Sequence, residues 1–150
     1  MLKDRLADDL KAAMRSKDAV RLRTIRSLRA ALMEKEIDLR EGGSATLTDE
    51  QELAVVQKQA KQRRDSILQY EEAGRQDLSV KEQAELAVIE AYLPDQLSEE
   101  EVRDAVRQIV EEIGAGSKGD IGRVMGTAMG KLRGRAEGRM VQRIAMEILS

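Results

Sequence analysis

Apolar side chains recur every three or four residues along almost the whole chain, and this period is that of an α-helix rather than a β-strand. The first example is Leu2, Leu6, Leu10 and Met14, which we expect to lie on one side of an N-terminal helix. The pattern returns in six later segments, which glycines, short polar stretches or the single proline separate. The spacing therefore predicts an all-α protein with seven helices and no β-strand.

Short capping motifs predict where several of these helices begin. Asp18 is the expected N-cap of the second helix, because its short side chain can accept a hydrogen bond from a backbone amide of the first turn. The next three helices each follow a capping box, in which a Ser or Thr and a Glu or Gln three residues later cap each other's amides. These boxes start at Thr48, Ser79 and Ser98. The sixth helix is expected to start at Ser117 to Asp120.

Glycine and proline predict where the helices end. The second helix carries an apolar side formed by Leu22, Ile25, Leu28, Leu32 and Leu39. We expect it to end at the run Glu41-Gly42-Gly43-Ser44, and Gly74 suits the C-cap of the third helix. Pro94 ends the fourth helix because its ring disfavours helix at the preceding residue. We place the domain boundary there, which predicts two helical bundles: four helices in residues 1–94 and three in residues 95–150.

The residues that this chain lacks exclude several kinds of chemistry. It has no Cys and no His, and two tyrosines are its only aromatic residues. A disulfide, a thiolate nucleophile and a Ser-His-Asp triad are therefore excluded. With two tyrosines, we do not expect base stacking on an aromatic platform. Gly130-Lys131 does not belong to a phosphate-binding loop, because Met125 and Leu132 stand where that motif needs Gly and Ser or Thr. We expect no catalytic residues, no metal and no cofactor.

The net charge of −2 hides a strong segregation of charge. Residues 1–40 carry 11 basic and 7 acidic groups (+4), residues 41–101 carry 6 and 15 (−9), and residues 102–150 carry 9 and 6 (+3). Within the last segment, seven basic side chains face only Asp120 and Glu137 between positions 118 and 143. This asymmetry favours a polyanionic partner, and the alternative is an ordinary solvated surface.

The strongest functional candidate is the segment from Lys131 to Arg139, which joins the last two helices. Arginine forks match phosphate oxygens, and the segment leads into a helix N-terminus that favours anions. The seven candidate nucleic-acid-binding residues are Lys118, Arg123, Lys131, Arg133, Arg135, Arg139 and Arg143. The alternative is a solvated basic loop.

Glycines at positions 122, 126, 130 and 134 repeat every four residues and are expected to share one helix face. Glycine costs about 1 kcal/mol per helix position relative to Ala, so the repeat needs a reason. We expect close packing against a neighbouring helix. The alternative is close approach of a nucleic-acid backbone.

Two further sets of arginines are expected to be structural. Arg21, Arg23, Arg26 and Arg29 lie on the second helix, and ion pairs with the acidic middle segment are the expected role. Arg64 falls within the apolar stripe of the third helix, so we expect it to be partly buried and paired with Glu71, Glu82 or Glu85.

Several short segments along the chain form a recognisable set: Arg63-Arg64-Asp65-Ser66-Ile67, Gly74-Arg75-Gln76-Asp77-Leu78, Glu82, Glu85, Tyr92-Leu93-Pro94, Asp120 to Gly126 and Gly134 to Gly138. With these residues the sequence resembles the YqeY family, and the resemblance covers the whole chain. Residues 95–150 also resemble the C-terminal tail of the GatB subunit of glutamyl/aspartyl-tRNA amidotransferase, a tRNA-binding appendage.

This resemblance implies a tRNA-binding protein or an accessory of tRNA-dependent amidation. It makes tRNA the expected partner, with an amidotransferase or an aminoacyl-tRNA synthetase as a further one. The label of a carbon–nitrogen ligase with glutamine as amido donor would be inherited from the larger enzyme, because the catalytic parts cannot be placed in this chain. The alternative is a protein-interaction module that docks through the acidic middle segment or the glycine face.

The N-terminal segment is charged and amphipathic, with no apolar stretch of a secretory signal. No segment reaches the roughly 20 apolar residues that span a bilayer. We therefore expect a cytoplasmic monomer that does not enter a membrane.

Overall fold

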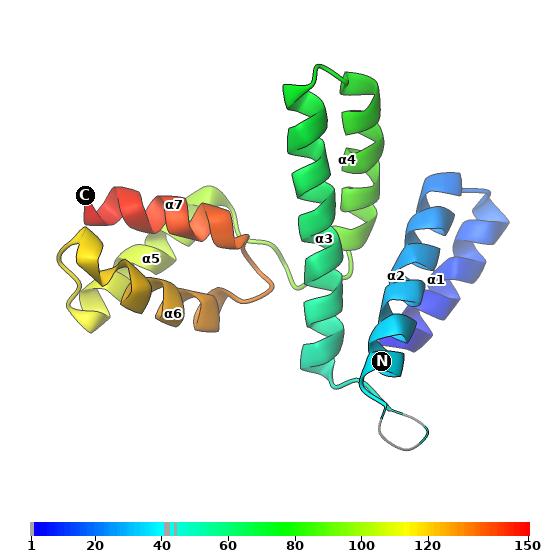
Figure 1. Cartoon of the computed structure of the whole chain (residues 1–150), viewed down its shortest axis with the longest axis horizontal. Coiled ribbons are helices and arrows are strands. Elements are labelled where there is room, and N and C mark those ends of the chain that lie inside the picture. The colour runs from blue at the N-terminus through cyan, green and yellow to red at the C-terminus, as the bar shows by residue number, and fades with distance from the viewer. Residues whose placement is uncertain (1, 41–42, 44) are drawn as a thin grey trace. The chain divides into compact units, whose positions relative to one another are not determined.

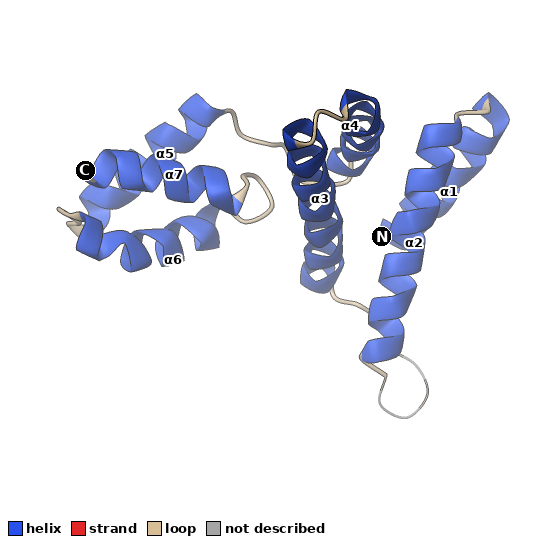
Figure 2. Cartoon of the chain, turned by 45° about the horizontal axis from the view of Figure 1, so that its top comes forward, coloured by secondary structure: helices blue, strands red, loops and turns tan. Residues whose placement is uncertain are grey.

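The computed structural model describes residues 2–40, 43 and 45–150. This part of the chain contains seven α-helices and no strand, so the predicted all-α class is confirmed (Figures 1 and 2). The helices are α1 (Leu2–Ser16), α2 (Ala19–Asp38), α3 (Asp49–Glu72), α4 (Gln76–Glu90), α5 (Glu99–Ile113), α6 (Ile121–Leu132) and α7 (Gly138–Leu149). A short 3₁₀ helix, η1 (Lys118–Asp120), precedes α6.

The chain divides into two compact units, Met1–Leu93 and Pro94–Ser150. In the first unit, α1 lies beside α2 and α3 beside α4, and α2 packs against both α3 and α4 (Figure 1). Its core consists of buried apolar residues from all four helices and the α2–α3 connection: Leu6, Ala13, Ile25, Leu28, Leu32, Leu47, Val56, Ala60, Ile89 and Tyr92.

The second unit is formed by α5, α6 and α7, each of which packs against the other two. Its core is made of small and medium aliphatic side chains: Val102, Val106, Ile109, Val124, Ala128, Leu132, Val141, Ile144, Ala145 and Leu149. These residues line one side of each helix, and the basic residues of the unit are left on the outer surface.

Most of the predicted helix ends are confirmed. The Asp18 carboxylate accepts the amide of Arg21 at 3.0 Å, and both predicted boxes at Thr48 and Ser98 are complete. Gly74 follows α3 in the left-handed region at φ 71°, and the Arg75 amide donates to the Tyr70 carbonyl at 2.8 Å. This is the Schellman arrangement, which satisfies carbonyls left free at a helix C-terminus.

The predicted capping box at Ser79 is wrong. Helix α4 already begins at Gln76, and Ser79 lies buried inside it, where its hydroxyl donates to the Glu71 carboxylate at 3.3 Å. The turn at Gly74 redirects the chain so quickly that the helix restarts two residues later without a side-chain cap. A capping motif in the sequence therefore does not mark the start of a helix when the preceding turn has already started it.

Two residues expected to face the core are exposed instead. Met14 is 54% exposed and Leu39 is 38% exposed, whereas Ala13 is buried. A spacing of four residues drifts by about 40° per step around a helix, so the fourth member of such a row has turned away from the core. Helix α2 ends at Asp38 with Leu39 as its C-cap, before the run Glu41-Gly42-Gly43-Ser44, of which the described residues include only Gly43.

Tyr92, just after α4, joins the end of that helix to α1. Its hydroxyl donates to the Asp9 carboxylate at 2.5 Å, and the Arg5 guanidinium lies 4.6 Å from its ring centroid. Arg5 also donates to the Ala91 carbonyl at 2.9 Å. Burial, together with the bond to Asp9, raises the pKa of Tyr92 to about 12. The phenol therefore keeps its proton, and its donor role, up to a higher pH than an ordinary tyrosine does.

Candidate nucleic-acid interface

All seven predicted nucleic-acid-binding residues lie exposed on the second unit. Lys118 lies on η1, Arg123 and Lys131 on α6, Arg133 and Arg135 in the α6–α7 loop, and Arg139 and Arg143 on α7. The fold thus brings six of them onto two neighbouring helices and the loop between them, and Lys118 onto the short helix that precedes α6.

The α6–α7 loop is held by hydrogen bonds to the segment that precedes α5. The Leu97 amide donates to the Arg135 carbonyl at 2.8 Å, and the Gln96 side-chain amide donates to the Gly134 carbonyl at 2.6 Å. The Arg135 side chain also donates to the Asp95 carbonyl at 3.4 Å. The arginines of this loop are therefore presented from a backbone that is fixed at several points. Gln96 had no signal in the sequence, since its partner lies 38 positions away.

Arg123, Lys131 and Arg143 also have roles within the unit. Lys131 pairs with Glu112 of α5 at 3.0 Å. Arg123 donates to the Ile113 carbonyl at 2.8 Å, where a cation suits the negative end of α5, and to Asp120 at 3.3 Å. These contacts fix the two side chains on the surface between α5 and α6.

Arg143 belongs to a network of ion pairs between α5 and α7. Its guanidinium donates to Glu99 at 2.9 Å and to Glu147 at 3.4 Å, and Glu147 also accepts from Arg103 at 2.7 Å. The bond to Glu99 raises the pKa of Arg143, and the bond to Arg103 lowers the pKa of Glu147. Arg143 therefore forms ion pairs within its own unit, which the prediction of a nucleic-acid contact did not include.

The glycine face of α6, which we define as Gly122, Gly126 and Gly130, is open. All three are exposed, and beyond the adjacent residues and backbone of α6 itself, a Cβ built on each meets no atom of the described residues within 4 Å. The expected close packing against a neighbouring helix is therefore wrong. The series is also shorter than predicted, because α6 ends at Leu132 and Gly134 lies buried in the loop at φ 78°.

Replacing glycine by alanine is expected to have opposite effects at two of these positions. Gly126→Ala should stabilise the second unit by about 0.5–1 kcal/mol, because a mid-helix glycine gains helix propensity without a clash. Gly134→Ala should destabilise it by about 1–2 kcal/mol, because an L side chain is strained at positive φ. Urea unfolding of both variants beside the wild type measures the signs. Equal signs would contradict the assignment of Gly134 to a left-handed turn.

In the first unit, the arginines of α2 divide into paired and unpaired members. Arg23 pairs with Glu85 at 3.0 Å, as predicted for the acidic segment, whereas Arg21 pairs with Asp9 of α1 at 3.7 Å. Arg26 and Arg29 form no ion pair with any residue that the structure describes. The prediction of ion pairs is therefore wrong for these two, which lie exposed on the surface of α2.

Arg63 forms the polar centre of the first unit. Its side chain is 15% exposed and lies 3.2 Å from Glu85 and 3.7 Å from Glu82. It also donates to Gln59 and to Ser27, both at 3.4 Å. The sequence analysis expected Arg64 to be the partly buried arginine that pairs with acids of this region. Arg64 is partly buried, but it pairs with Glu90, at 3.4 Å. Two carboxylates three residues apart on α4 were the available signal for a facing cation.

Glu82 makes this centre sensitive to pH. Burial, and then repulsion from Glu85, raises the pKa of Glu82 above its ordinary value of 4.5. When folding raises the pKa of a carboxyl, its protonated form stabilises the folded state. This contribution to stability is complete at pH values below the ordinary pKa, and it is lost as the pH rises through the pKa of the folded state. We therefore expect the free energy of unfolding of Glu82→Gln, measured relative to the wild type, to increase from pH 4 to pH 7. Urea titrations at both pH values measure this, and a parallel decline of both proteins would contradict it.

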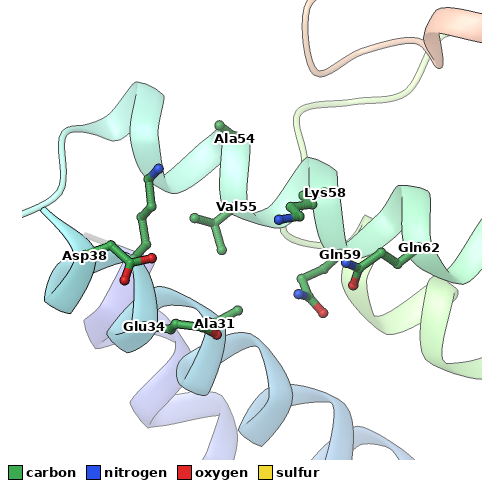
Figure 3. A pocket seen from close by; sticks show the side chains of 9 residues that line it. Ala31, Glu34, Asp38, Ala54, Val55, Lys58, Gln59 and Gln62 are labelled. Atoms are coloured by element: carbon green, nitrogen blue, oxygen red, sulfur yellow. The ribbon is translucent and has the colours of Figure 1, made fainter.

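A groove of 520 Å³ lies between α2 and α3 (Figure 3). Ala31, Ala54 and Val55 line it together with Glu34, Asp38 and Lys58, and the figure shows the two acids on the α2 side and Lys58 on the α3 side. The lining mixes the acids Glu34 and Asp38 with the bases Lys35 and Lys58, so its charge favours neither anionic nor cationic ligands.

Comparison with known proteins decides the family. Residues 3–149 match the family described as Yqey-like protein. The chain belongs to the YqeY-like family. The resemblance to the YqeY family that the sequence predicted is thereby confirmed over residues 3–149.

Several fungal proteins named "Altered inheritance of mitochondria protein 41, mitochondrial" are relatives of this YqeY-like chain. The one from Pyrenophora tritici-repentis is 37% identical over 81% of this chain and 66% of its own length. Those from Eremothecium gossypii and Saccharomyces cerevisiae (strain YJM789) are 42% and 38% identical, over 59% and 72% of this chain and 46% and 58% of their own lengths. The chain thus spans about half to two thirds of these relatives.

The expected cytoplasmic location is contradicted by these relatives, whose names describe mitochondrial proteins. The expectation relied on the absence of an apolar secretory stretch. Import into mitochondria uses amphipathic basic segments, to which that argument does not apply. Among the described residues, no helix is both long enough and apolar enough to cross a membrane.

Proposed function

We propose that this YqeY-like protein binds tRNA through its second unit and serves as an accessory of tRNA-dependent amidation. The basic α6–α7 loop and the helices beside it contact phosphates of the RNA. The backbone of the loop supports this proposal. Arg133 and Arg135 are exposed, and the hydrogen bonds that the carbonyls of Gly134 and Arg135 accept hold the loop backbone in place. Recognition is by shape and phosphate, since RNA helices offer side chains little else to read.

The observation that carries the proposal is the open glycine face beside these cations. Three helix glycines weaken α6 by about 1 kcal/mol each, and no described neighbour makes use of the space that they leave. A surface without side chains lets a phosphate backbone approach the helix closely. The resemblance to the amidotransferase tail supports tRNA as the source of that backbone.

Binding to bulk tRNA over a salt series tests the proposal. About four phosphate contacts should give a slope of log K against log salt of roughly −3 to −4, because each contact releases a counterion. Affinity that does not change with salt would contradict it. If no tRNA binds at all, the alternative of a protein-docking module becomes the better one.

A further inference from the structure

The outward side of α2 carries exposed apolar residues. Met33 and Ile37 lie one helical turn apart and are 54% and 56% exposed. They continue a row with a spacing of three or four residues, which we call the α2 outer face: Arg26, Arg29, Ala30, Met33 and Ile37. All five are exposed. The row belongs to the first unit, whereas the candidate interface belongs to the second.

A hollow of 330 Å³ opens beside this face. Lys3 of α1 and Arg29, Leu32, Met33 and Glu36 of α2 line it. Leu32 is only 1% exposed and gives the hollow an apolar floor, and an ion pair of 2.7 Å joins Lys3 to Glu36 at its edge. Such a hollow can hold one apolar side chain, as the anchor pockets of protein interfaces do.

The charges of the α2 outer face favour a partner with negative charge. Arg26 and Arg29 have no carboxylate partner among the residues that the structure describes, although Arg21 and Arg23 of the same helix do. Unpaired cations beside an apolar strip complement carboxylates beside an apolar strip.

We propose that the α2 outer face binds an acidic amphipathic helix of a partner protein. An apolar residue of that helix fills the hollow, its apolar stripe covers Met33 and Ile37, and its carboxylates pair with Arg26 and Arg29. RNA fits less well, because its phosphates would leave both apolar side chains without a counterpart. A membrane fits less well, because surface-bound helices need a broader apolar face than two residues.

Selection of helical peptides from a phage-displayed library on the 150-residue chain tests this proposal. The enriched peptides should combine Asp or Glu with Leu, Met or Phe on one face. Added to the labelled protein, such a peptide should shift the backbone amide signals of residues 26–37. Arg26→Glu/Arg29→Glu and Met33→Asp should each weaken its binding at least about tenfold, since all three side chains are exposed and the fold should tolerate the changes.

Arg133→Glu/Arg135→Glu is the matched control, with the same change of charge on the other unit, and it should leave the peptide affinity unchanged. Failure to enrich any peptide, enrichment of basic peptides or shifts outside α2 would overturn the proposal. It would also be overturned if bulk tRNA or vesicles of phosphatidylserine shifted the same α2 signals, because the face would then serve RNA or a membrane.

Discussion

Reversing the charge of Arg133 and Arg135 together is expected to weaken tRNA binding about 100-fold or more at roughly 0.1 M salt. Hydrogen bonds to charged groups contribute about 1.5–3 kcal/mol each, and the reversal replaces two of them with repulsion. The magnitude of the salt slope should also fall by about 2, since two counterion-releasing contacts are lost. Filter binding or fluorescence anisotropy over a salt series measures both effects.

Arg26→Glu/Arg29→Glu provides the control for this experiment. It changes the net charge by the same amount at two exposed arginines of the first unit. If both double variants lost affinity equally, binding would follow overall charge rather than a surface of the second unit. A triple replacement of Gly122, Gly126 and Gly130 by alanine gives a second test. It should raise stability and lower tRNA affinity together, so unfolding cannot explain the loss.

Replacing Arg63 by methionine is expected to cause the largest loss of stability, about 2–4 kcal/mol. The substitution removes the cation between Glu82 and Glu85 and leaves two partly buried carboxylates facing each other. For a unit of this size, the thermal midpoint of the first unit should fall by about 10–20 °C. Thermal unfolding followed by circular dichroism measures it.

Two further variants separate the charge network from the packing of Arg63. Adding Glu82→Gln/Glu85→Gln to Arg63→Met should recover most of the loss, because the repulsion between the two carboxylates disappears. Arg75→Met removes an exposed arginine from a surface pair with Asp77, and the midpoint should barely change. If the triple variant were as unstable as Arg63→Met alone, the loss would come from packing and not from charge.

The structure also shows how far the candidate interface could be predicted from the sequence. The exposure of the four basic residues on α6 and α7 follows from helix periodicity, since a charged side chain opposite an apolar stripe faces water. Their partners within the unit do not follow. Arg143 meets Glu99 across 44 positions and Gln96 meets Gly134 across 38, and such pairs depend on how the helices pack.

The sequence by itself determined the elements of this protein. The caps at Asp18, Thr48 and Ser98 involve residues three positions apart, and such local hydrogen bonds form wherever the helix forms. Tertiary structure alone decided which groups meet: Arg63 rather than Arg64 faces Glu82 and Glu85, and the glycine face of α6 stays open instead of packed. The reason is physical. A one-residue step turns a helical side chain by about 100°, so small differences in how two helices pack decide which neighbour contacts the partner.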